Sequence, residues 1–154
     1  MANTTGETIF SEGAETVIND TSTLTVLDGA FTAAATTNLS ITNLESRPFL
    51  DIAGSFTFAA APAATNKSMS LHYRFINIDG TSDEPAIDAE FEGHYEGSFQ
   101  LDAAAGVTTH YFLLTDVSAP KPSRTVEVYC KNNSGQTLTA FKLAVTPAGY
   151  NGAA

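Results

Sequence analysis

The chain has 154 residues, a hydrophobic content of 43% and a formal net charge of −10. This length fits one domain that buries a hydrophobic core without cross-links. Only seven residues are Lys or Arg, so the chain lacks the basic surface that nucleic acids and anionic membranes attract. The composition therefore predicts no nucleic-acid partner and no membrane partner.

The N-terminal residues 1–36 are rich in Thr, Ser, Asn, Gly and Ala and contain only short apolar patches. Such a segment is expected to form an extended arm that lies in solvent or on another molecule. Ile9, Phe10, Val17 and Ile18 are the apolar residues that the arm would bury against a neighbouring subunit. The first residues show neither a basic start nor an apolar run, so no signal peptide is predicted.

From residue 37 onward, apolar residues alternate with polar ones, as is typical of half-buried β-strands. The pattern predicts one strand near 37–44 and a second apolar run at 49–52. A third run follows Gly54, where Phe56 and Phe58 alternate with small polar residues. The turn-forming residues after it predict a loop.

The clearest alternation lies between residues 69 and 75. The residues expected to share its inner face are Met69, Leu71, Tyr73 and Phe75, with Ser70, His72 and Arg74 on the other. In the next strand, the same spacing places Tyr95 on one face with Gly97, Phe99 and Leu101. Both strands are therefore predicted to turn one apolar face toward the core.

Three further strands are predicted in the last third of the chain. The first, at 107–115, has apolar residues at successive positions, which indicates burial on both faces. The second, at 126–130, is joined by an Asn- and Gly-rich hairpin turn to the third, at 138–145. A bulge is expected near Ala140, and Pro147 is expected to end the last strand.

These signals give about eight strands and no competing amphipathic helix. The sequence therefore predicts an all-β fold, an antiparallel β-sandwich of jelly-roll or immunoglobulin-like type. The expected organisation is an extended arm at 1–36, a sandwich domain at 37–147 and a C-terminal tail at 148–154. The order of the strands stays open at this level.

An acidic loop follows the strand at 69–75 and holds the candidate metal ligands Asp79, Asp83, Glu84 and Asp88. Calcium takes six to eight oxygen ligands, often from carboxylates on one loop. The spacing departs from that of an EF-hand loop. The alternatives are therefore a solvated acidic loop without a cofactor and a loop that binds Ca²⁺.

No pattern of catalytic residues stands out. None of the histidines, His72, His94 and His110, has the spacing of a helical metal site, and each is expected to be a surface or loosely packed residue. The single cysteine, Cys130, lies in an alternating run and is expected to be a buried thiol. The chain has no Gly-x-Ser-x-Gly motif. It is therefore expected not to be an enzyme.

Most aromatic residues fall on core-facing positions of the alternation, and the chain has no Trp. Tyr150 and Phe10 are the candidates for exposed aromatic residues. Sugar-binding surfaces use exposed aromatic rings, but contact between a chain terminus and a partner protein is the preferred role of these two residues.

Five segments carry a resemblance to a known group of proteins. They are residues 54–62 (GSFTFAAAP), 69–78 (MSLHYRFINI), 79–81 (DGT), 97–99 (GSF) and 132–138 (NNSGQTL). Together they resemble small virion structural proteins of tailed bacteriophages, of the head decoration or cement type. The resemblance covers 48–147 and rests on strand and turn motifs, with no catalytic signature.

The resemblance implies a β-sandwich on the outer surface of a phage head, after synthesis in the host bacterial cytoplasm. The implied partners are the major capsid protein and two further copies in a homotrimer. The interface residues that we expect are Ile9, Phe10, Val17, Ile18 and Tyr150. The alternatives are a structural component of the phage tail or baseplate and a glycan-binding adhesion module.

Overall fold

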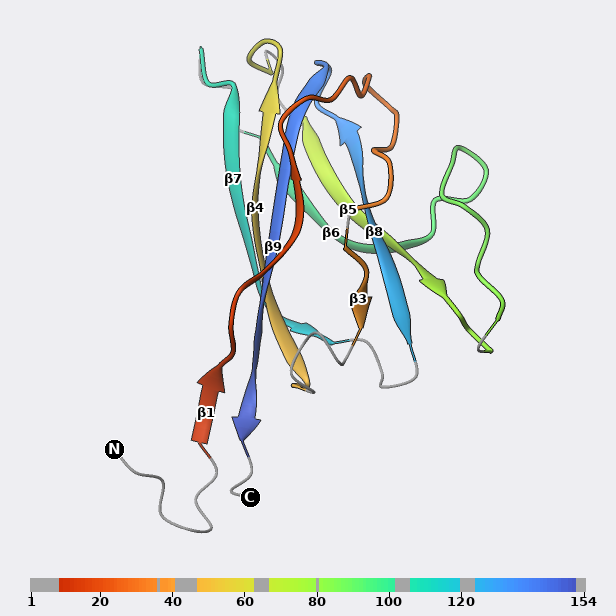
Figure 1. Cartoon of the computed structure of the whole chain (residues 1–154). Coiled ribbons are helices and arrows are strands. Elements are labelled where there is room, and N and C mark those ends of the chain that lie inside the picture. Colours follow the sequence, from red (N-terminus) through yellow and green to blue (C-terminus); the bar gives the residue numbers. More distant parts are fainter. Residues whose placement is uncertain are drawn as a thin grey trace.

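The structure is a computed structural model whose described part is entirely β, with nine strands and no helix (Figure 1). It describes residues 9–35, 37–40, 47–62, 67–79, 81–101, 106–119 and 124–151. The strands are β1 (Ile9–Glu12), β2 (Thr16–Thr21), β3 (Leu39–Ser40), β4 (Phe49–Phe58), β5 (Ser68–Ile76), β6 (His94–Gln100), β7 (Thr109–Ser118), β8 (Thr125–Asn133) and β9 (Leu138–Asn151).

The strands form two antiparallel sheets that pack face to face (Figure 1). The first sheet has the order β1-β9-β4-β7, with β2 also paired to β9, and the second has the order β3-β8-β5-β6. Strands β2 to β9 are thus paired from the outside inward: β2 with β9, β3 with β8, β4 with β7, and β5 with β6. This nested pairing is that of one long hairpin rolled into a sandwich, the jelly roll. The predicted antiparallel β-sandwich is confirmed, and of the two predicted types the strand order selects the jelly roll.

The centre of the sandwich is a cluster of aromatic rings contributed by both sheets. Phe56 of β4 is fully buried. Its ring stacks on Phe112 of β7 with centroids 4.6 Å apart and on Phe141 of β9 with centroids 5.5 Å apart. Phe99, from β6 of the opposite sheet, lies 4.3 Å from Phe112. These contacts fix the two sheets to each other through side chains that the alternation placed on inner faces.

Strand β4 runs without interruption through the glycine that separates its two predicted apolar runs. A Cβ at Gly54 would lie 2.1 Å from the backbone oxygen of Lys142 and 2.7 Å from the ring of Phe112. Only a residue without a side chain fits there. The glycine therefore marks a close backbone approach inside one strand, as glycines in strands often do.

The N-terminal segment, expected as an extended arm, lies against the sandwich over its described part. Strands β1 and β2 pair in turn with β9, and residues after β2 bridge to Leu138 through Val26 and to Lys131 through Phe31. Ile18 is fully buried in the core. The segment thus crosses from the first sheet to the second along one side of the roll.

Strand β9 continues beyond Pro147 to Asn151, so the prediction that this proline ends the strand is wrong. The carbonyl oxygen of Pro147 accepts a hydrogen bond from Gly13, on the side of β1 and β2. In a β-strand, the N–H and the C=O of one residue face the same neighbouring strand, so the nitrogen of Pro147 also faces β1 and β2. The missing N–H therefore falls at the junction between β1 and β2, where it interrupts no hydrogen bond to β4.

The turn between β8 and β9 is confirmed. Gly135 adopts a φ of 75°, a conformation that glycine reaches without strain. Asn132 is fully buried, and its side-chain nitrogen donates to the carbonyls of Val26 and Gln136. Its oxygen accepts from the N–H and hydroxyl of Ser134. The predicted bulge near Ala140 is also confirmed, because the register with β4 shifts between Leu138 and Ala140.

Candidate functional site

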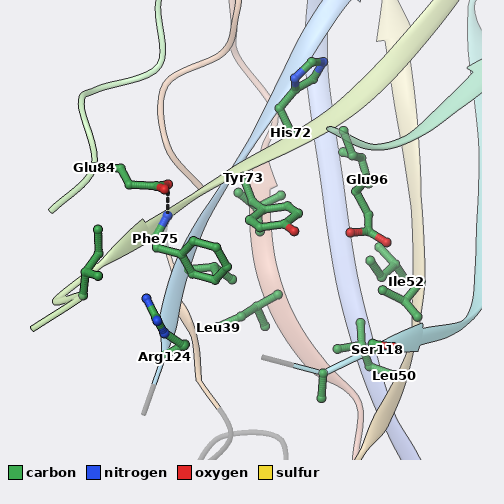
Figure 2. Close-up of a pocket in the computed structure, with 16 residues that line it drawn as sticks. Leu39, Leu50, Ile52, His72, Tyr73, Phe75, Glu84, Glu96, Ser118 and Arg124 are labelled. Carbon is green, nitrogen blue, oxygen red and sulfur yellow. Dashed lines mark hydrogen bonds between the residues drawn. The ribbon is translucent and has the colours of Figure 1, made fainter. Parts of the chain in front are cut away.

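A cavity of about 470 Å³ lies between the two sheets, at the end where β4 and β8 begin and β5 and β7 end (Figure 2). This volume lies in the range of small-molecule sites. The apolar residues that line it are Leu39, Leu50, Ile52, Leu71, Tyr73, Phe75, Ile78, Val117, Ala119, Val126 and Val128. The polar residues that line it are His72, Glu84, Glu96, Ser118 and Arg124. The cavity is therefore mostly apolar, with a few charged groups.

A β-bulge in β6 brings Glu96 to this cavity. Leu71 pairs with Gly97 and His72 pairs with Tyr95, so Glu96 is the extra residue between the two pairs. Gly97 faces the core, because a Cβ there would lie 3.2 Å from the side chain of Leu114. A bulge re-aims the side chains of its strand. Glu96 and Gly97 of β6 are thus both directed inward. Because Gly97 has no side chain, only Glu96 of the two places a side chain in the cavity.

The Glu96 carboxyl lies in a largely apolar environment, beside Ile52 in Figure 2. Burial raises the pKa of this carboxyl, with no opposing contribution. Burial, together with the nearby Glu96 and Glu84 carboxylates, also raises the pKa of Tyr73. Within the described residues, no hydrogen bond or ion pair reaches the Glu96 carboxylate.

The other charged groups of the cavity have partners. Glu84 accepts hydrogen bonds from the backbone N–H of Phe75 at 2.7 Å and from His94 at 2.9 Å. Burial opposes the ionised form of Glu84, but these bonds and the charges of His94 and Arg124 hold its pKa below the ordinary value. The Arg124 guanidinium lies over the Phe75 ring, 5.4 Å from its centroid. Of the two acids in the cavity, Glu96 alone is without a partner in the described part of the chain.

A second surface feature lies on the outer face of the first sheet. Leu113, Ala53 and Ala144 are cross-strand neighbours in one row, which Val17 of β2 extends. Tyr111 lies in the adjacent row. Tyr111 is 84% exposed, Leu113 61% and Val17 55%. We call these five residues the outer apolar face. A hollow of about 450 Å³ borders it.

The prediction that β7 is buried on both faces is wrong, because its outer face carries these exposed residues. The apolar character of Tyr111 and Leu113 indicated a covered face, but no second layer covers them in the described structure. Tyr95 is likewise 60% exposed, although the alternation placed it inside. The bulge at Glu96 reverses the facing of β6 at that point, and alternation alone contains no sign of a bulge.

The residues predicted for an interface lie in different parts of the structure. Val17 lies on the outer apolar face, whereas Ile18 contributes to the core. The backbones of Ile9 and Phe10 pair with those of Asn151 and Tyr150 at the edge of the first sheet, so the predicted residues of the two ends adjoin. The side chains of Ile9, Phe10 and Tyr150 lie outside the described part of the structure.

The carboxylates of the acidic loop accept hydrogen bonds from backbone N–H groups in and next to the loop. Asp79 accepts hydrogen bonds from the N–H and hydroxyl groups of Thr81 and Ser82, and these bonds lower its pKa. Asp83 accepts from the N–H of Asn77, and Asp88 from two backbone N–H groups of its own turn. Among the described residues, no three His, Cys, Asp or Glu residues are grouped to hold a metal ion.

Two histidines differ from the expected surface position. His72 is buried on the outer side of β5, with ring nitrogens 3.0 Å from the Ser70 hydroxyl and 2.9 Å from the Glu92 carbonyl oxygen. Burial lowers its pKa. The aromatic rings of Phe31 and Tyr95 cover it, from segments distant in sequence. His110 is also buried, and its Nε2 has no hydrogen-bond partner among the residues that the structure describes.

The described residues include no helix long and apolar enough to cross a membrane. Cys130 is fully buried, as predicted, and burial raises the pKa of its thiol. In comparisons with known proteins, the chain matches no protein-family model, no curated protein and no solved structure.

Proposed function

We propose that the protein is a non-catalytic decoration protein of a tailed bacteriophage, which binds the major capsid protein on the outer surface of the head and stabilises it. The outer apolar face is the observation that carries this proposal. Contiguous exposed apolar residues mark surfaces that contact other proteins. The resemblance of the strand and turn motifs to phage decoration proteins supplies the identity of the partner.

Burial of apolar side chains would drive binding through this face. Leu113 projects from a row whose neighbouring positions hold Ala53 and Ala144, so a partner can approach the sheet closely there, whereas the neighbours of Tyr111 in its row are Ser55 and Lys142. Burying a large apolar side chain contributes about 1.5–3 kcal/mol. The net charge of −10 keeps the remaining surface soluble and limits non-specific association between particles.

The proposal includes a homotrimer on the capsid. In the described structure, β7 pairs with β4 on one side and with no strand on the other. An open edge strand can pair with a strand of another chain. The edge of β7 is therefore available for contact between copies, next to the outer apolar face.

Labelling of intact virus particles tests the location. Antibody to this protein, detected with gold in electron micrographs of purified particles of the encoding virus, should spread over the head. Label confined to the tail would replace the proposal with a tail or baseplate component. Particles without label would refute a virion role, and a glycan screen of the isolated protein would follow.

Substitution of the outer apolar face tests the surface. A Tyr111→Ser, Leu113→Ser variant should lose binding to particles that lack the protein, while its melting temperature stays within a few degrees of wild type. Tyr95→Ser is the matched control, because Tyr95 is comparably exposed on the second sheet. Equal binding of both variants would show that capsid contact uses another surface.

A further inference from the structure

The cavity between the sheets holds a charge that the described structure leaves unpaired. The Glu96 carboxylate enters an apolar space through the bulge of β6, and no cationic or hydrogen-bond donor group of the described residues reaches it. Glu96 is partly exposed, and a ligand that covered its carboxylate would make the lost hydration costly unless the ligand paired with it. Glu96 is therefore complementary to a cation that enters the cavity.

The surroundings of Glu96 define the shape of that cation. Tyr73 lies in the middle of the group that Figure 2 labels, with Glu96 on one side and Phe75 and Arg124 on the other. The rings of Tyr73 and Phe75 meet edge to face with centroids 5.5 Å apart. Tyr73 also stacks on His94 with centroids 5.1 Å apart, and the Phe75 ring carries Arg124. The attraction for a cation therefore comes mainly from the Glu96 carboxylate, and the aliphatic walls contributed by both sheets accept an apolar body.

The charge at the other end of the cavity gives a direction. Arg124 lies over Phe75 and close to Glu84, away from Glu96 in Figure 2. Its guanidinium repels a cation from that end, while the Glu84 carboxylate and the Phe75 ring already interact with it. The favourable position for a ligand's positive charge is therefore the Glu96 end, with the apolar part between the sheets.

We propose that this cavity is a binding site for a small organic ammonium ion with an apolar body, whose N–H groups donate to the Glu96 carboxylate beside Tyr73. The aliphatic or aromatic part packs against Leu50, Ile52 and Val117. This site is separate from the outer apolar face and does not rest on binding to a capsid.

A matched pair of probes tests the proposal with the full-length protein. Phenethylammonium and phenethyl alcohol share an apolar body, but only the first carries a positive charge. In isothermal titration calorimetry near neutral pH, the ammonium should bind at least about tenfold more tightly than the alcohol. A tenfold ratio of dissociation constants corresponds to a difference of about 1.4 kcal/mol in binding free energy. Equal affinity for the two probes, or no detectable binding of the ammonium, would overturn the proposal.

Two variants locate the bound probe. Glu96→Gln keeps the size of the side chain, and it should remove the preference for the ammonium while the weaker binding of the alcohol stays. Val117→Phe should weaken both probes because it fills part of the cavity. Glu90→Gln is the control, since Glu90 is an exposed acid outside the cavity. An undiminished preference for the ammonium in a folded Glu96→Gln variant would overturn the assignment. If that variant does not fold, the comparison of the two probes with the wild-type protein decides whether the proposal stands.

Discussion

The aromatic cluster at the centre of the roll makes a quantitative prediction about stability. Phe56 contacts aromatic rings of three other strands, with centroid distances of 4.6 Å to Phe112, 5.5 Å to Phe141 and 5.9 Å to Phe99. The change Phe56→Ala would remove its ring from all three contacts and leave a cavity between the sheets. We expect the variant to fold but to be markedly less stable.

The expected magnitude follows from the complete burial of Phe56. Truncation of a buried Phe to Ala costs about 3–5 kcal/mol of unfolding free energy. In a domain of this length, each kcal/mol lowers the melting temperature by about 2–4 °C. The melting temperature of the variant should therefore fall by roughly 6–20 °C.

Urea titration monitored by circular dichroism, together with a thermal melt, measures both quantities. Tyr111→Ala is the matched control, because Tyr111 lies on an adjacent strand and is 84% exposed. Its unfolding free energy should change by less than about 0.5 kcal/mol. A loss below about 1 kcal/mol for Phe56→Ala, or equal losses for both variants, would refute the reasoning that Phe56 joins the two sheets.

Three further predictions concern individual positions. Gly54→Ala should be far more destabilising than Gly97→Ala in urea titrations, because the new methyl group meets the backbone oxygen of Lys142 in the first case and a movable leucine side chain in the second. Comparable losses would contradict this. Cys130 should react with iodoacetamide in denaturant and resist it in the folded protein, as mass spectrometry can show; rapid labelling of the folded state would place the thiol at the surface. The lowered folded-state pKa of Glu84 means that its stabilising contribution is complete above its unfolded pKa and is lost as the pH falls through the folded pKa. Glu84→Gln should therefore reduce the acid-induced loss of stability. If the melting temperature of the variant fell at low pH as much as that of the wild type, the role of the Glu84 hydrogen bonds would be refuted.

Much of the fold follows from period-two alternation. The inner faces of β4 and β5, the buried Cys130 and the turn after β8 were all predictable, because side-chain alternation and turn chemistry are local properties. The pairing of β2 with β9 was not, because it joins segments more than a hundred residues apart. Local patterns predict that strands exist but leave their neighbours open, so the choice between jelly roll and immunoglobulin-like topology required the structure.

The candidate site was less accessible from sequence than the fold. Glu96 looks like any other acidic residue near the acidic loop, and only the bulge in β6 directs it inward. The exposure of Tyr111 depends on the absence of a second layer over the first sheet in the described structure. The burial of His72 depends on Phe31, which reaches it from the N-terminal segment. Each of these outcomes depends on contacts between distant segments.

The nested pairing of the strands has a consequence for the order in which they can assemble. Tyr73 and His94, a pair in the inner hairpin of β5 and β6, are 21 residues apart, whereas Thr21 and Phe141, in the pair of β2 and β9, are 120 apart. Closing the longer loop in an unfolded chain costs about 1.5 kcal/mol more in chain entropy. Each inner pair that forms shortens the path between the strands of the next one. The roll can therefore close from β5 and β6 outward, with β2 and then β1 joining β9 last. Topologies dominated by such distant pairings fold slowly.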